Sequence, residues 1–126
     1  MVAGWLHEAH ADLDLAEHLL SEGTGFLNAI AFHSQQAAEK YLKAILTSRQ
    51  IEFPKTHELA RLLKLIATVD AKLADALDDV IVLTPYGVAL RYPGDRPDTT
   101  QDKARDAVEL ARKVRDAVTK RLEHLP

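Results

Sequence analysis

The sequence predicts an all-α protein, namely an up-down antiparallel four-helix bundle with an additional short helix, about five helices in total. Its five glycines and five prolines are confined to the gaps between four long segments, 5–22, 26–53, 55–84 and 98–125. Alanine and leucine are frequent in these segments, and their apolar side chains recur at helical spacing. Short connections between long helices favour antiparallel neighbours, which is the arrangement of a bundle.

The first segment, 5–22, predicts an amphipathic helix. Its apolar side chains recur at helical spacing: Trp5, Ala9, Leu13, Ala16 and Leu20. His7 and His10 are three residues apart, and Asp14 and His18 follow on roughly the same polar side. Imidazole and carboxylate groups on one face suit zinc or iron. Metal sites in bundles usually draw their ligands from facing helices, however, so we expect a solvated acidic face and no metal.

The second segment, 26–53, predicts the central helix of the bundle. One apolar face contains Phe26, Ile30, Ala37, Tyr41, Ala44 and Ile45. A second apolar face contains Ala31, Leu42 and Leu46. A small bundle cannot easily cover both faces from within one chain, and a large apolar patch left on a surface marks a site of association. We therefore expect the protein to be a homodimer.

The third segment, 55–84, predicts two helices. Thr56 is a good N-cap for a helix over residues 57–68. The inward side chains of this helix are Leu59, Leu62, Leu63 and Ile66. Asp70 can cap the second helix. The inward side chains of that helix are Leu73, Leu77, Val80 and Ile81.

The last segment predicts a helix that starts near residues 98–100. Its apolar side chains are Ala104, Ala107, Val108, Ala111, Val118 and Leu122. Its outer face offers oppositely charged pairs at i,i+4 spacing, which stabilise helices: Arg105 with Glu109, Glu109 with Lys113, and Arg112 with Asp116.

Length and composition exclude several classes of protein. The 126 residues suit one domain, 1–126, and 47% hydrophobic with 28% charged residues is ordinary globular usage. The absence of cysteine excludes a disulfide framework, a thiolate metal site and a cysteine nucleophile. No charge-free run is long enough to cross a membrane, and no secretory leader is recognisable, so we expect a cytoplasmic protein. We expect no cofactor.

A polar strip on the second helix is a candidate binding site for phosphate groups. Gln36, Lys40 and Lys43 occupy positions i, i+4 and i+7 of that helix. The basic residues Arg49, Lys55, Arg61 and Lys64 follow. Lysine ammonium groups in such a strip can neutralise the phosphates of RNA or of a nucleotide. The alternative is a solvated edge with helix salt bridges.

The expected start of the third helix is a second candidate. A helix N-terminus attracts phosphate through its free N–H groups, and Lys55 and His57 flank Thr56 there. The imidazole of His57 could serve as an acid, a base or a ligand. The alternative is that Thr56 is only a cap and that the side chain of His57 packs over it.

The long connection between Pro85 and Pro97 contains the dipeptide Arg91-Tyr92. A guanidinium group can clamp phosphate while the neighbouring ring stacks on a base. The same pair can instead anchor the connection to the bundle. The sequence contains no phosphate loop, no zinc-protease motif and no serine–histidine–aspartate order, so it offers no complete catalytic constellation.

Four pieces of the chain, in order, resemble HEPN domains. The run FHSQQAAEKYLKA at 32–44 resembles the second-helix signature of that family. The other pieces are Trp5 with the tripeptide ADL at 11–13, the run PKTHEL at 54–59, and RYP at 91–93. Together they cover most of the chain, from residue 5 to about 120.

The resemblance implies a homodimeric bundle of about five helices. Small prokaryotic HEPN proteins are often encoded beside a minimal nucleotidyltransferase, in toxin–antitoxin-like pairs. Many HEPN proteins are metal-independent ribonucleases, whose motif is an arginine with a histidine about four to six residues further on. Arg91 matches that arginine, but residues 92–100 contain no histidine. The motif is therefore incomplete, and we expect little intrinsic ribonuclease activity.

These observations favour a dimeric accessory module that binds RNA or a nucleotide and works with a nucleotidyltransferase. Its expected ligand-binding residues are Gln36, Lys40, Lys43, Lys55, His57, Arg91 and Tyr92. One alternative is a ribonuclease toxin that uses Arg91 and a non-standard base. The other alternative is a purely structural dimer.

Overall fold

The computed structural model describes residues 1–87 and 99–124, and all regular structure within them is helical. The elements in order are α1 (Val2–Ser21), α2 (Leu27–Ser48), α3 (Leu59–Ala67), α4 (Ala71–Ala76), the 3-10 helix η1 (Asp78–Gly87) and α5 (Gln101–Glu123). The prediction of an all-α bundle with additional short helical structure is confirmed. In the described part of the chain, no helix combines the length and the apolar character that a membrane span requires.

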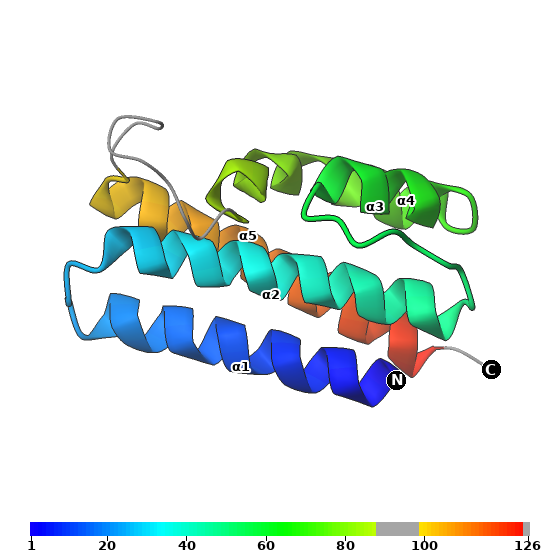
Figure 1. Cartoon of the computed structure of the whole chain (residues 1–126), viewed down its shortest axis with the longest axis horizontal. Helices are drawn as coiled ribbons and strands as arrows, with labels where there is room; N and C mark the ends of the chain where they lie inside the picture. Colours follow the sequence, from blue (N-terminus) through cyan, green and yellow to red (C-terminus); the bar gives the residue numbers. More distant parts are fainter. Residues whose placement is uncertain (88–98, 125–126) are drawn as a thin grey trace.

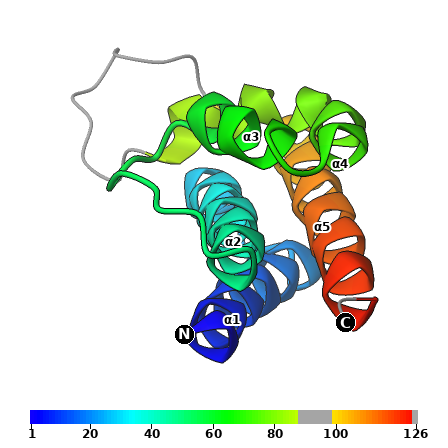
Figure 2. The ribbon, with the colours of Figure 1, turned by 90° about the vertical axis from the view of Figure 1, so that its right-hand side faces the viewer.

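The helices form two layers. The long helices α1, α2 and α5 pack side by side, with α1 antiparallel to α2 (Figure 1). The short elements α3, α4 and η1 lie together across one side of α2 and α5 (Figure 2). The three short elements α3, α4 and η1 thus take the place of a single fourth helix of the bundle. Helix α2 lies between α1 and this layer of short elements.

Helix α2 is the most buried element, as the sequence predicts. Ile30, Tyr41, Leu42 and Leu46 each expose 1% or less of their surface. Helix α1 covers one side of α2, and α5, α3 and η1 cover the others. The premise that a second chain is needed to cover both apolar faces is therefore wrong. Burial of α2 gives no support to a dimer.

Both long outer helices bury apolar stripes in which alanine is frequent. In α1 the fully buried residues are Ala9, Leu13 and Ala16. In α5 the buried residues are Ala104, Ala107, Val108, Ala111, Val114 and Val118. Thr100 is the N-cap of α5, because its hydroxyl oxygen accepts a hydrogen bond of 3.1 Å from the Lys103 backbone N–H. This start agrees with the expected one.

The predicted boundaries in the middle of the chain need two corrections. The Thr56 hydroxyl accepts a hydrogen bond from the backbone N–H of Glu58, so it closes a turn before α3 and does not cap a helix from residue 57. Asp70 does cap α4, through the N–H of Leu73 at 3.0 Å. However, α4 ends at Ala76, and Val80 and Ile81 lie in η1.

The prediction of i,i+4 ion pairs along the outer face of α5 is also wrong. Arg105 pairs with Asp102, and Arg112 pairs with Glu109 and with Glu17 of α1 at 2.6 Å. Lys113 pairs with Asp79 of η1 at 2.9 Å. Carboxylates on neighbouring elements lie closer than those one helical turn further along α5, so several pairs join elements to each other.

Candidate functional site

A buried carboxylate on α2, that of Glu39, organises the polar groups in the middle of the molecule. Glu39 exposes only 3% of its surface. Its Oε1 atom accepts hydrogen bonds from His57 Nδ1 at 2.7 Å and from Gln35 Nε2 at 3.3 Å. Its Oε2 atom is 2.9 Å from Lys43 Nζ. A buried charge needs such partners, and Glu39 has three of them.

Lys43 is buried with Glu39 and is not an open phosphate-binding group. It exposes 7% of its surface. Its ammonium nitrogen is 5.4 Å from the ring centre of Trp5 and 5.9 Å from that of Phe53, within the range of cation–π attraction. The two rings contact each other, with centres 6.1 Å apart. Lys43 therefore joins α1 and the segment after α2 to the Glu39 carboxylate.

Lys40 has a carboxylate partner of its own on α1. Lys40 Nζ is 2.6 Å from Asp12 Oδ2, and His33 Nδ1 is 2.9 Å from Asp12 Oδ1. Gln36 donates a hydrogen bond of 2.7 Å to the side-chain oxygen of Gln35. The predicted strip is therefore not an open row of cations, because each of its lysines pairs with a different carboxylate.

His57 combines a fixed ring with an exposed edge. A carboxylate only accepts hydrogen bonds, so Nδ1 donates its proton to Glu39 and Nε2 is left as the acceptor of the neutral ring. The side chain of His57 is 63% exposed. The Gln35 amide also donates to the His57 backbone carbonyl at 3.2 Å, which holds the segment before α3 against α2. Carboxylate-oriented imidazole is an arrangement suited to proton transfer.

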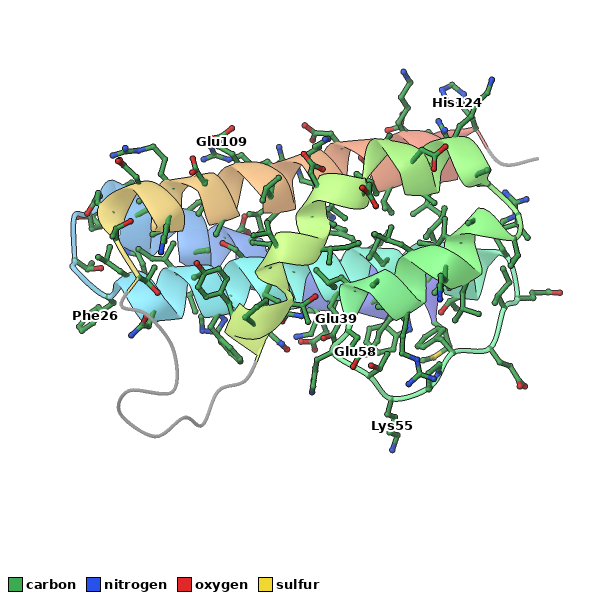
Figure 3. The ribbon with its side chains drawn as sticks, turned by 90° about the horizontal axis from the view of Figure 1, so that it is seen from above. Phe26, Glu39, Lys55, Glu58, Glu109 and His124 are labelled. Carbon is green, nitrogen blue, oxygen red and sulfur yellow. The ribbon has the colours of Figure 1, made fainter. Side chains whose placement is uncertain are left out.

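Lys55 lies in the same segment and has no ion pair with any described residue. Figure 3 shows its side chain pointing away from the helices. Of the expected ligand-binding residues, the structure thus brings Gln36, Lys43 and His57 together around Gln35 and Glu39, and leaves Lys55 in solvent. Arg91 and Tyr92 lie outside the described residues.

Gly87 and Thr99, which flank residues 88–98, both lie against side chains of α2. A Cβ atom placed on Gly87 would be 2.6 Å from the side-chain amide carbon of Gln35, a distance that real contacts do not reach. Thr99 is buried, and its hydroxyl donates a hydrogen bond to the side-chain oxygen of Asn28. Glycine at 87 is therefore needed for the close approach of η1 to the Gln35–Glu39 group.

Sequence reasoning missed the carboxylates and amides that hold this site. Glu39 and Lys43 are four residues apart, and that spacing was a usable signal for their pair. Nothing local indicated that Asp12 would meet Lys40 and His33 on another helix, or that Gln35 would contact Gly87.

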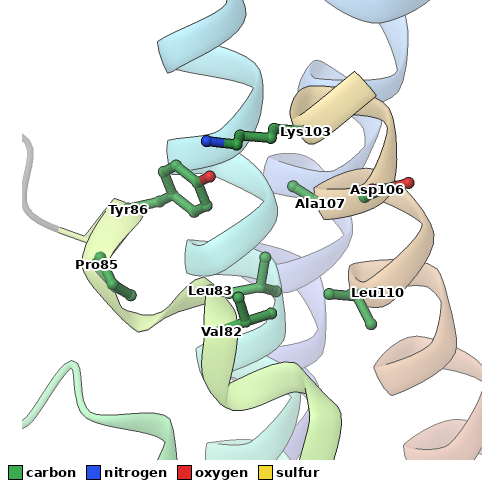
Figure 4. Close-up of a pocket in the computed structure, with 8 residues that line it drawn as sticks. All are labelled: Val82, Leu83, Pro85, Tyr86, Lys103, Asp106, Ala107 and Leu110. Carbon is green, nitrogen blue, oxygen red and sulfur yellow. The ribbon is translucent and has the colours of Figure 1, made fainter. Parts of the chain in front are cut away.

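Two surface hollows are lined by residues other than this group of polar side chains. The first, of about 420 Å³, lies between η1 and α5 and is mostly apolar (Figure 4). Its lining residues are Val82, Leu83, Pro85, Tyr86, Lys103, Asp106, Ala107 and Leu110. The second, of about 430 Å³, lies between α3 and the segment before it, and is lined by Pro54, Arg61, Lys64, Leu65 and Thr68.

The histidines of α1 do not form a metal site with other described residues. Among residues 1–87 and 99–124, no three histidine, aspartate or glutamate side chains are placed to hold an ion together. His10 instead shares a hydrogen bond with the hydroxyl of Tyr41. Burial of the Tyr41 ring raises the pKa of its hydroxyl to about 12.

The chain matches the family model described as the HEPN domain over residues 2–122. It is also similar to two solved structures. TT1696 from Thermus thermophilus is 28% identical with a TM-score of 0.76, and the match covers 94% of this chain and 96% of that one. ST0689, described as an archaeal HEPN homologue, is 24% identical with a TM-score of 0.72, over 96% and 97% of the two chains. A search of curated proteins gave no match.

Proposed function

Since this chain belongs to the HEPN domain family, we propose that it is a homodimeric accessory protein that binds RNA or a nucleotide and works in the cytoplasm with a minimal nucleotidyltransferase. The observation that carries this proposal is the incomplete ribonuclease motif. Arg91 is present, but the next histidine along the chain is His124. A HEPN protein without the proton-transfer group of that motif can still hold phosphate, because binding needs the cation and not the imidazole.

The proposed contacts change once the ion pairs are considered. Lys55 and His57 remain proposed ligand contacts, because both are exposed on one segment of the surface. Arg91 and Tyr92 remain proposed contacts on the basis of the sequence. Lys40 and Lys43 are bound to Asp12 and Glu39, so a phosphate would have to displace a carboxylate from each. We assign these two lysines, and Gln36 beside them, to holding the fold.

Two experiments test the proposal. The purified chain should bind fluorescently labelled single-stranded RNA in an anisotropy titration, with affinity that falls as salt rises. Co-expression with a nucleotidyltransferase encoded beside it should yield a complex that survives size-exclusion chromatography, and light scattering of the chain alone should give a dimer mass. Absence of RNA and nucleotide binding, together with a lone 14.0 kDa species, would contradict the proposal.

A second candidate function is a metal-independent ribonuclease toxin with a degenerate motif. The observation that favours it is the pairing of His57 with the buried Glu39 carboxylate, which fixes an imidazole with one exposed nitrogen. Such a group could take the proton of a ribose 2′-hydroxyl. The test is cleavage of labelled single-stranded RNA in the presence of a chelator. His57→Asn can still donate to Glu39 but cannot transfer a proton, so activity that survives this substitution would exclude His57 as the base.

A further inference from the structure

Ion pairing divides the basic residues of the described chain into two groups. Those with a carboxylate partner are Lys40, Lys43, Arg105, Arg112, Lys113, Arg115 and Arg121. Those in residues 1–87 and 99–124 without an ion pair are Arg49, Lys55, Arg61, Lys64, Lys72, Lys103 and Lys120. The first four of the second group fall within residues 49–64, where Glu52 and Glu58 are the acidic residues. Unpaired positive charge is therefore concentrated on α3 and the segment that leads to it.

Arg61 and Lys64 of this group line the same hollow. They are three residues apart on α3, so their side chains leave the helix on neighbouring positions of one face. Both are exposed. The hollow of about 430 Å³ is otherwise lined by Pro54, Leu65 and Thr68. Two cations thus border a concave surface that is largely apolar.

The segment that forms the opposite wall is fixed on both sides of Pro54. Phe53 packs against Trp5 of α1, with ring centres 6.1 Å apart. His57 is bonded to Glu39 and Gln35 of α2. The wall is therefore held by Trp5 of α1 and by the polar groups of α2. It need not be ordered when a ligand enters, which lowers the cost of binding.

We infer that this hollow binds a backbone phosphate of single-stranded RNA. The Arg61 guanidinium can donate two parallel N–H groups to the phosphate, and Lys64 adds a second positive charge. The ribose of the same nucleotide then packs against Pro54 and Leu65. Neither cation has to leave a carboxylate first, unlike Lys40 and Lys43. This inference rests on the proposed RNA binding and gives it a location.

The test compares the full-length protein with two double variants of equal charge. Arg61→Gln/Lys64→Gln removes both cations from the hollow, whereas Lys103→Gln/Lys120→Gln removes two unpaired cations from α5. A fluorescent single-stranded RNA is titrated at several salt concentrations, with thermal unfolding measured for each protein. We expect the first variant to bind the RNA about tenfold more weakly than the wild-type chain, or weaker still. The slope of log affinity against log salt concentration should be smaller in magnitude by about 0.7 for each lost phosphate contact. The α5 variant should lose much less.

Each outcome decides a different point. Equal affinity and slope in the two double variants would overturn the inference while RNA binding by the wild-type chain stands. A wild-type chain that binds no RNA would overturn the inference and the proposed RNA binding together. Arg61→Lys keeps the charge and loses the paired N–H groups, so it should weaken binding by less than Arg61→Gln. Competition by free AMP as strong as by an equal concentration of the RNA would show a mononucleotide site instead.

Discussion

Helices α2 and α3 each carry two basic residues at close spacing, and only the pair on α3 is available to a ligand. On α2, Lys40 and Lys43 pair with Asp12 and with the buried Glu39. On α3, Arg61 and Lys64 border a hollow and have no ion pair with a described residue. The difference lies in whether a carboxylate on another turn or helix can reach the cation. A row of basic residues in a sequence therefore shows where charge is, but not where charge is free.

The largest effect on stability is expected for Lys43→Ala. The substitution leaves the Glu39 carboxylate buried without its cation, although His57 and Gln35 still donate to it. Removing one partner of a buried ion pair costs about 3–5 kcal/mol, and the two remaining donors place the expected loss near 3 kcal/mol. Urea denaturation measures this loss. Arg61→Ala, on the exposed face of α3, should change the free energy of unfolding by no more than about 0.5 kcal/mol. Equal losses in the two variants would remove the contrast between α2 and α3.

Gly87→Ala tests the contact that brings η1 onto the polar groups of α2. The added Cβ would overlap the buried Gln35 amide. That amide donates hydrogen bonds to the Glu39 carboxylate and to the His57 backbone carbonyl. We expect a loss of about 1–3 kcal/mol, the usual cost of overpacking. Gly4→Ala is the matched control, because nothing lies within 4 Å of its Cβ position in α1. That change should be neutral or stabilising by up to about 1 kcal/mol. Unfolding of Gly87→Ala at the wild-type denaturant midpoint would contradict the close approach.

Asp70→Asn tests an ion pair of intermediate burial through its pH dependence. The hydrogen bond from Arg121 and that from the Leu73 N–H lower the pKa of Asp70 below its usual value. The pair therefore stabilises the native state above about pH 4, where the unfolded carboxyl is ionised, and this contribution is lost as the pH falls through the lower native pKa. Asparagine keeps the helix cap, so at pH 7 the variant should be less stable by at most about 1 kcal/mol. The difference should shrink toward pH 3, and a difference that stays constant with pH would show that it does not come from the carboxylate charge.

The elements were predictable because they follow from the order of residues along the chain. The gaps with glycine and proline and the apolar spacing located α1, α2 and α5. Asp70 marked the start of α4, and residues 98–100 marked the approximate start of α5. The errors arose where a distant residue decides the outcome. Asp12 neutralises Lys40 from another helix, and the start of α3 moves to Leu59 because Thr56 closes a turn instead of capping a helix. Coverage of α2 within one chain likewise depends on packing that local patterns do not show.

Lysine footprinting by acetylation and mass spectrometry tests the difference between α2 and α3 most directly. A buried ammonium in an ion pair reacts slowly with an acetylating reagent, whereas a solvated, unpaired one reacts fast. In the free protein we expect rapid modification of Lys64 and slow modification of Lys43, with single-stranded RNA protecting Lys64 and leaving Lys43 unchanged. Modification of Lys43 as fast as that of Lys64, or protection by RNA at Lys40 and Lys43 but not at Lys64, would contradict the assignment of the free cations to α3.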